Sequence, residues 1–269
     1  MMHRMSPRPR LHFRLAANLA GFVAIAGLLL WLVVHGAGAM PYRWQWARVV
    51  PYLVISHQDG FHPGPLLRGL GVTLSISAWG FAVTLAAGLA TALLAQSRSI
   101  VGRAVARGYV ELIRNTPLLV QLYLFYFVLA PILGIGREAT GILALGLFEG
   151  AFAAEIIRAG IAAVPRGQWE AGASLGLSAW RLRRHIILPQ ATRIVLPPLT
   201  SLSISLVKHS AIVSAIAIFD LTNEARNIIA DTFLTFEIWL TIAAIYLAVT
   251  TTMSALATLL ERRLARGHS

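Results

Sequence analysis

Cysteine is absent from this chain of 269 residues, and lysine occurs only once. The absence of cysteine excludes structural disulfides, thiolate metal sites and cysteine catalysis. A phosphate-binding P-loop needs a lysine directly after glycine, whereas Lys208 stands in SISLVKHSA with no glycine nearby. The chain is therefore expected neither to hydrolyse ATP nor to hold a cofactor, and it is not expected to be an enzyme.

Charged residues are also scarce. They make up 13% of the chain against 57% hydrophobic residues, with a mean hydropathy of +0.69, which is too apolar for a soluble domain. The composition predicts an all-α integral membrane protein with about six transmembrane helices. The first is expected to be a retained helix and not a cleaved signal peptide, because no A-x-A-like site follows closely. The predicted spans are 15–35, 66–96, 117–134, 140–163, 194–217 and 238–260.

Acidic residues number 11 and basic residues 23, and the arginines are unevenly distributed. Six spans place most of them on one side, in the two terminal tails and in the segments between spans two and three and between spans four and five. Arginine-rich loops are typical of the cytoplasmic face, so both termini are expected to be cytoplasmic and the chain to lie in the inner (cytoplasmic) membrane. This bias and anionic lipid explain the net charge of +12, and no nucleic-acid partner is expected.

Two short polar groups could carry other chemistry. His57, Asp59 and His62 in HQDGFH could bind a metal, but no regular spacing directs them at one ion, and a loop facing water is favoured. His209 and Ser210 could suggest a hydrolase. Adjacent residues on a helix point about 100° apart, however, so they cannot form a base–nucleophile pair. No metal site and no catalytic residue is expected.

The segment QWEAGASLGLSAWRLRRHIILPQ, residues 168–190, is polar and rich in small residues, although it lies between apolar runs. It predicts a short helix whose small face, with Gly172, Ala173 and Gly176, can press close against another protein. Glu170 is expected near the helix start, and Ser178 is expected to cap the next helix. An amphipathic loop lying on lipid headgroups is the alternative, which the basic run RLRRH also supports. Three apolar residues are expected to anchor the segment: Trp169, Leu175 and Leu177.

The same segment resembles a known family. EAGASLG, followed by an isoleucine-rich stretch and LP, is similar to the EAA loop of ABC-importer permeases. It departs from the usual pattern by having Gly172 in place of the second alanine. The resemblance implies that this loop couples the chain to an ATPase through six residues: Glu170, Ala171, Gly172, Gly176, Leu188 and Pro189.

Longer blocks narrow the resemblance to permeases for polar amino acids. They occupy 109–127, 153–171, 187–201 and 208–222, and together with GVTLSIS they cover about 69–260. The family implies a MetI-like type I importer fold with a cytoplasmic coupling helix. Its implied partners are two ATPase subunits that bind ATP and Mg, a second permease subunit, and a periplasmic or extracellular substrate-binding protein. Acidic or general L-amino acids are the expected substrates.

The expected organisation has three parts. Residues 1–65 form a cytoplasmic tail, the first transmembrane helix and a periplasmic loop; residues 66–262 form the permease domain; and residues 263–269 form a cytoplasmic tail. The loop at 36–65 contains Trp44 and Trp46, which suit an interfacial aromatic belt, and it is expected to be a lid or spacer.

Polar side chains within or beside the spans are candidates for the substrate path, because such groups are costly in lipid unless they face a cavity or a partner. Glu149 could bind the ammonium of an amino acid and Lys208 its carboxylate. Alternatively, Glu149 and Lys208 could pair with each other structurally. Three further candidates for the path are Asn115, Gln121 and Glu155. Three residues are expected to line an outer gate or to contact the binding protein: Asp220, Glu224 and Arg226.

Two other functional classes remain open from the residues alone. A stand-alone secondary transporter or channel would not need a small-faced inner loop and would usually show repeat symmetry. An intramembrane enzyme would need a convergent nucleophile and base, which the sequence does not display.

Overall fold

The structure is a computed structural model that describes residues 9–39, 42–57 and 60–266. The chain forms two compact units, residues 1–44 and 45–269. The first unit contains one long helix, α1 (Pro9–Ala39), whose segment Asn18–Gly36 is apolar enough to cross a membrane. This agrees with the predicted first span.

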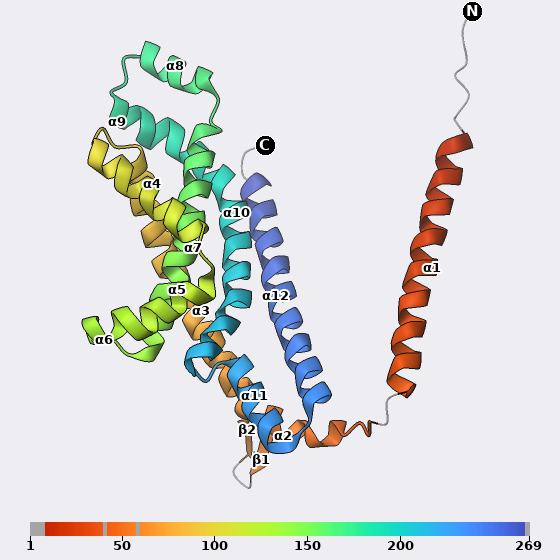
Figure 1. The fold of residues 1–269 in the computed structure, drawn as a ribbon. Coiled ribbons are helices and arrows are strands. Elements are labelled where there is room, and N and C mark those ends of the chain that lie inside the picture. The colour runs from red at the N-terminus through yellow and green to blue at the C-terminus, as the bar shows by residue number, and fades with distance from the viewer. Residues whose placement is uncertain (1–8, 40–41, 58–59, 267–269) are drawn as a thin grey trace, which may run out of the picture. The chain divides into compact units, whose positions relative to one another are not determined.

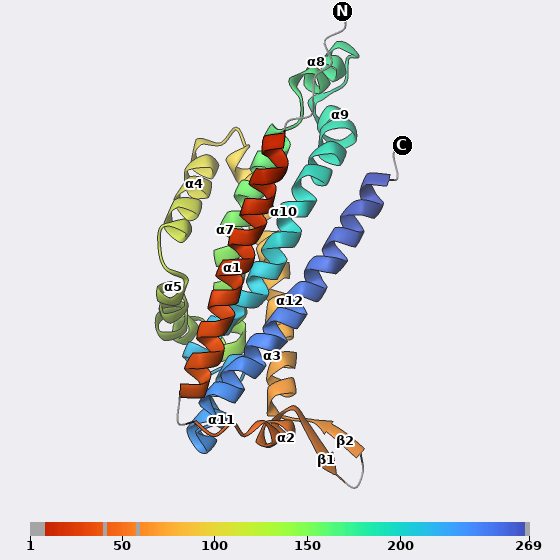
Figure 2. The same ribbon diagram turned by 90° about the vertical axis from the view of Figure 1, so that its right-hand side faces the viewer.

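The second unit is a helical bundle, shown from two sides in Figures 1 and 2. Three of its predicted spans are confirmed within a few residues. They are α3 (Pro65–Ala95), α7 (Arg137–Ala162) and α12 (Thr235–Arg266). Helix α3 packs along α7, which also contacts α10, and α10 in turn contacts α12.

The span predicted at 194–217 is longer than expected. An unbroken helical segment of 38 residues runs from Ala179 to Ile216. It consists of α9 (Ala179–Leu182), a π-helical turn η3 (Arg183–Ile187), α10 (Leu188–His209) and a 3₁₀ segment η4 (Ser210–Ile216). The basic run RLRRH therefore belongs to the start of this helix and not to a loop.

The span predicted at 117–134 is wrong as a single straight helix. Three short elements follow one another there: α5 (Leu118–Leu124), the π-helical turn η2 (Phe125–Leu129) and α6 (Ala130–Leu133). They are joined to α4 (Ile100–Arg114) by a bend of 110°, and the two parts are long and apolar enough for a span only together. Pro117 lies in the bend and disfavours helical geometry at Thr116. The described residues thus contain five candidate spans, or six if the bent pair is one.

Small residues bring α3 and α7 into close contact. A Cβ added at Gly146 would lie 2.5 Å from the Cβ of Val83, and one added at Gly88 would lie 2.6 Å from that of Ala153. The Thr84 hydroxyl donates to the carbonyls of its own helix at Gly80 and of α7 at Gly146, at 2.9 and 3.2 Å. Glycine-lined contacts are typical of helix packing in membranes.

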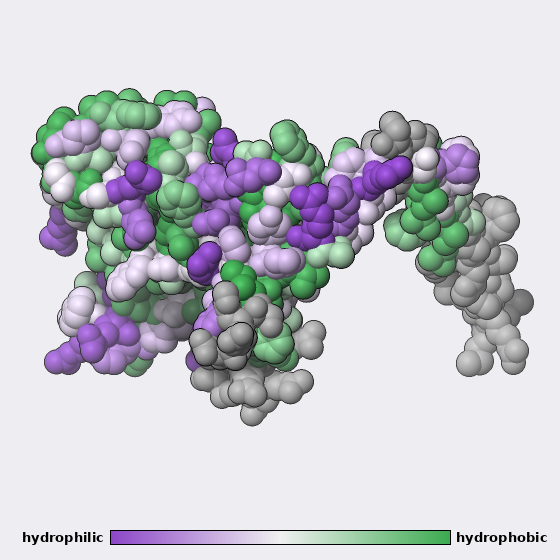
Figure 3. Space-filling view, turned by 90° about the horizontal axis from the view of Figure 1, so that it is seen from below, coloured by the Kyte–Doolittle hydropathy of each residue, from purple (hydrophilic) through white to green (hydrophobic). Residues whose placement is uncertain are grey.

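One end of the bundle carries elements that the sequence analysis did not predict. These are the 3₁₀ turn η1 (Trp46–Arg48), helix α2 (Val50–Leu53), an antiparallel hairpin of β1 (Val54–His57) and β2 (Gly60–Pro63), and helix α11 (Leu221–Thr232). The backbone amide of Gln45 donates to the buried Glu237 carboxylate at 2.7 Å, which ties this segment to α12. Figure 3 shows hydrophobic and hydrophilic patches side by side on the surface at this end.

Candidate coupling helix and polar sites

Helix α8 (Arg166–Ser174) lies at the opposite end of the second unit from the hairpin (Figure 1). It ends because Gly176 adopts a left-handed conformation, with φ of 72°. The amide of Gly176 donates to the carbonyl of Ala173 at 2.9 Å, and the amide of Leu177 donates to that of Gly172 at 3.2 Å. The chain then turns into α9, whose first turn is capped by the Ser178 hydroxyl, as the sequence predicts.

The small face predicted for α8 is wrong in two positions. Gly172 points inward, where an added Cβ would clash with the Leu182 side chain. Gly176 has open space around it, and its requirement for glycine comes from its positive φ. Trp169 and Leu177 pack on the cluster formed by Val164, Leu182, Ile187 and Ala191, as anchors should. Leu175 instead is 77% exposed.

The exposed side of α8 contains Glu170, Ala171 and Ala173. Glu170 is the fifth residue of the helix and lies outside its first turn, so the predicted interaction with the positive end of the helix dipole is not made. Leu188 and Pro189 begin α10 directly after the π-helical turn. Proline has no amide hydrogen to donate to the residue four positions earlier in an α-helix. Pro189 therefore fits next to a π-helical turn, where the regular α-helical hydrogen bonds are already interrupted.

Asn115 and Gln121 both stabilise the bend between α4 and α5. The Asn115 amide donates to the Glu111 carbonyl at 2.8 Å. The buried Gln121 amide donates to the Ile113 carbonyl at 2.8 Å and to the Thr116 hydroxyl at 2.6 Å. The Gln121 Oε1 atom is buried and has no hydrogen-bond partner in the part of the chain that the structure describes.

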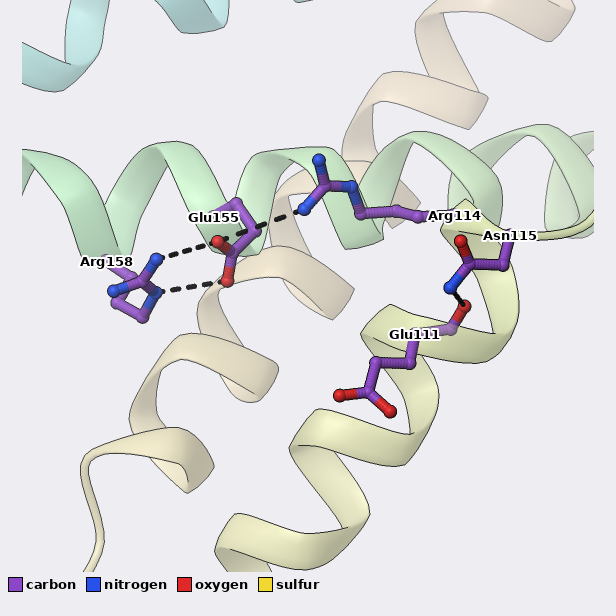
Figure 4. A network of polar contacts seen from close by, with 5 residues as sticks. All are labelled: Glu111, Arg114, Asn115, Glu155 and Arg158. Atoms are coloured by element: carbon purple, nitrogen blue, oxygen red, sulfur yellow. Dashed lines mark hydrogen bonds and ion pairs between the residues drawn. The ribbon is translucent and has the colours of Figure 1, made fainter.

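Glu155 is the centre of a charged group on α4 and α7 (Figure 4). Arg158 donates to both of its carboxylate oxygens, at 3.1 and 2.8 Å. Arg114 approaches the same carboxylate at 4.0 Å from α4 and lies over the Phe152 ring, 5.4 Å from its centroid. The three charged side chains are 33–53% exposed, so water reaches them.

Glu149 pairs with His209, a partner that the sequence pattern does not indicate. Its carboxylate, 2% exposed, lies 2.5 Å from the Nδ1 atom of His209 at the end of α10. His209 is half-exposed, and its ring also meets the Phe148 ring edge-on. The alternative pairing of Glu149 with Lys208 is not formed. The signal for His209 in the sequence was its position beside Lys208 in a span, where any ionisable group is costly.

Lys208 faces a different part of the molecule. It lines an open cavity of about 470 Å³ between α10 and α12, whose other walls include the hydroxyl side chains of Thr250, Thr251, Ser254 and Thr258. Glu149 lies on α7, on the side of α10 that His209 faces. Glu149 and Lys208 thus have different neighbours on the two sides of α10.

Asp220 caps α11 and is fully buried. Its carboxylate accepts hydrogen bonds from the amides of Asn223 and Thr222, at 2.9 and 3.3 Å. Burial raises the pKa of Asp220 to about 6, and these amides oppose the rise. Burial likewise raises the pKa of Glu224, against the opposing charge of Arg68. Arg226 is exposed. Of the three predicted gate residues, Asp220 has a structural role, as the cap of α11.

Metal binding finds no support among the described residues, where no three potential ligands come together. Asp59, one of the three possible ligands in HQDGFH, lies outside the described residues.

Comparison with known proteins places these features in a family. Residues 84–266 match the family described as binding-protein-dependent transport system inner membrane component. The chain is 35% identical over 202 residues to the glutamine transport system permease protein GlnP of Escherichia coli (strain K12), covering 74% of this chain and 92% of that protein. It is 36% identical over 214 residues to the L-cystine transport system permease protein TcyB of Bacillus subtilis (strain 168), covering 78% and 90%.

Solved structures agree. A crystal structure of an amino acid ABC transporter with histidines has a chain 42% identical to this one, with a TM-score of 0.70, covering 74% of this chain and 94% of that chain. An inward-facing structure of the MetNI methionine ABC transporter, at 20% identity and a TM-score of 0.63, covers 75% and 97% and shares the fold. The chain thus has the MetI-like fold that its sequence indicates, and it belongs to the binding-protein-dependent inner-membrane components as a permease of the amino-acid ABC importer family.

Proposed function

We propose that the chain forms the translocation path of an importer for polar L-amino acids, acidic or general in specificity. The names of its relatives support glutamine as the first substrate to test, since the E. coli relative is a glutamine permease. Another relative, from Rhodobacter capsulatus, is named for glutamate, glutamine, aspartate and asparagine together. A stand-alone secondary transporter is disfavoured because the family is defined by binding-protein-dependent transport.

The observation that carries the proposal is the form of α8. This helix projects at one end of the bundle and is fixed on both sides, by α7 before it and by α9 after it. Trp169 and Leu177 hold it against its own chain, whereas Leu175 is exposed and has no role in that packing. A short helix that ends next to an exposed apolar residue is suited to seat in a groove of another protein.

On this proposal α8 is the coupling helix, the end of the bundle that carries it is cytoplasmic, and both termini lie on that side. Two ATPase subunits bind ATP and Mg and close on nucleotide, and a rigid contact passes this motion to the membrane chain. A second permease subunit, identical or related, completes the path. An extracytoplasmic binding protein delivers substrate to the hairpin end.

Substrate contacts within the path are proposed for Lys208 in the α10–α12 cavity, where an ammonium can meet a substrate carboxylate. Glu149, Glu155, Asn115 and Gln121 then act mainly on the shape of the path, because each is already engaged within the chain.

The test combines co-purification with uptake. The permease is expressed together with its candidate ATPase and binding protein, and co-purification of the ATPase is measured. Uptake of a panel of amino acids into proteoliposomes is then measured with ATP. Leu175→Glu should abolish co-purification of the ATPase, since the change places a charge in an apolar contact. Phe61→Glu, an equal change at a residue 82% exposed on the hairpin, should leave it intact. An ATPase that remains bound to the Leu175→Glu protein would contradict docking through α8.

A further inference from the structure

An open cavity of about 460 Å³ lies among α3, α4 and α7, within the range of roughly 300–1,000 Å³ that is typical of small-molecule sites. The walls from α3 are Thr91, Ala92 and Ala95, in the last turns of that helix, and Arg158 is near the end of α7 that leads into α8. The cavity is therefore at the α8 end of the bundle.

Charges of both signs line this cavity. Arg107, Glu111 and Arg114 are spaced four and three residues apart, which puts them on one face of α4 in the order positive, negative, positive. Opposite them on α7, the Glu155 carboxylate is already held by Arg158.

Unlike Glu155 and Arg158, the side chains of Glu111 and Arg107 are not paired with an opposite charge among the described residues. Among the described residues no hydrogen bond or ion pair reaches the Glu111 carboxylate, which in Figure 4 extends from α4 to the side on which Glu155 and Arg158 lie. No ion pair is formed by Arg107 in that part of the chain, and Arg114, which lies over the Phe152 ring, has one ion-pair contact there, at 4.0 Å from Glu155. An unpaired carboxylate thus stands between two guanidinium groups with spare donors.

We propose that this cavity binds a free L-amino acid from the cytoplasmic side. The substrate ammonium pairs with Glu111, and its carboxylate accepts hydrogen bonds from Arg107 and Arg114, since guanidinium groups bind carboxylates in bidentate geometry. Small apolar walls, from Ala92, Ala95 and Ala154 among others, leave room for a side chain. The inference rests on the proposed function, because the ligand is the imported amino acid itself.

Occupancy of this site has a regulatory consequence. The ligand would lie between α4, whose three charged residues hold both of its poles, and the Ala154 wall of α7, and so favour the helix arrangement seen here. A ligand that prefers one arrangement shifts the equilibrium toward it and slows the cycle. Imported amino acid that accumulates inside therefore lowers the rate of further import.

The experiment uses the full transporter in proteoliposomes, with its binding protein outside and ATP within. Uptake of radiolabelled L-glutamine is measured into vesicles that contain either no amino acid or unlabelled L-glutamine, and inhibition is expressed relative to the empty vesicles of the same variant. Wild-type uptake should fall as internal glutamine rises. Glu111→Gln should raise the concentration needed for inhibition about tenfold, through loss of one charge-assisted contact. Glu138→Gln, an equal change at the start of α7, should inhibit as wild type does.

Two glutamine analogues, loaded inside the vesicles, test whether the site recognises both the ammonium and the carboxylate. N-acetyl-L-glutamine lacks the ammonium and L-glutamine amide lacks the carboxylate, so each should inhibit at least about tenfold more weakly than glutamine. Uptake that is insensitive to internal glutamine, or that N-acetyl-L-glutamine inhibits as well as glutamine does, would overturn the inference. Both results leave uptake itself intact. Absence of uptake of every amino acid into empty vesicles would instead contradict the proposed function.

Discussion

Replacing His209 by alanine should destabilise the permease, because it removes the partner of a buried carboxylate. Glu149 is 2% exposed and lies 2.5 Å from the imidazole nitrogen. Leaving a buried polar group without its hydrogen-bond partner typically costs about 1–3 kcal/mol, and more for a charged group. The His209 side chain is 47% exposed, so water can approach the carboxylate in the variant. We therefore expect a loss of about 2–3 kcal/mol.

The assay is thermal unfolding of the purified protein in detergent, followed by tryptophan fluorescence. His209→Ala should lower the melting temperature, and the double change with Glu149→Gln should restore most of it, since a neutral amide costs less to bury than a carboxylate. Lys208→Met is the matched control in the adjacent position. Because Lys208 faces the α10–α12 cavity and not Glu149, its loss should leave the melting temperature nearly unchanged.

Either of two results would refute this reasoning. One is a His209→Ala protein as stable as wild type, which would mean that the carboxylate is solvated or differently paired. The other is a Lys208→Met protein that is destabilised and then rescued by Glu149→Gln, which would restore the pairing that the structure excludes.

Three further predictions concern other parts of the chain. Gly172→Leu should lower the melting temperature by an amount equivalent to about 1–3 kcal/mol, because the new side chain overpacks against Leu182. Burial raises the pKa of Asp220 from 3.8 to about 6, so the folded state binds more protons than the unfolded state between these pH values. The protein should therefore lose up to about 3 kcal/mol of stability as pH rises through this interval. Measurements of unfolding against pH should show no such loss in Asp220→Asn. Ser174→Cys on the cysteine-free chain should react with an impermeant thiol reagent only after the membrane is opened, and Asp231→Cys should react from outside.

Each of these has a clear contrary result. Unchanged unfolding of the Gly172→Leu protein would show that α8 can turn its face outward. A pH profile identical in wild type and Asp220→Asn would exclude Asp220 as the source of the dependence. Reversed labelling of the two cysteines would invert the proposed orientation and place α8 outside.

The straight helices could be predicted from the sequence because hydrophobic length alone determines them. The runs behind α3, α7 and α12 are long and predominantly apolar, and their bounds agree with the prediction within a few residues. The broken pair α4 and α5 could not be found in this way. Its 110° bend contains Pro117 and is stabilised by the hydrogen bonds that Gln121 makes with Ile113 and Thr116. A hydropathy pattern does not reveal these hydrogen bonds.

The sites show the same division between local and tertiary signals. The cap at Ser178 follows from residue type and position, and it was predicted correctly. The inward orientation of Gly172 depends on Leu182, which lies in the next helix, and the pairing of Glu149 depends on which residue of α10 faces α7. Sequence alone places Lys208 and His209 side by side, but only the packing of α10 decides which of them meets the carboxylate.

This packing also gives α10 a mechanical role in the proposed function. The helical segment from Ala179 to Ile216 is unbroken and spans roughly 55 Å at 1.5 Å per residue. It begins at the turn after α8 and passes through His209, which is bonded to Glu149 on α7, and Lys208, which faces α12. If an ATPase displaces α8 as proposed, this continuous segment links the displacement to both polar contacts near its far end. Because Lys208 and His209 face different helices, a rotation or translation of α10 would change the α10–α12 cavity and the contact with α7 together.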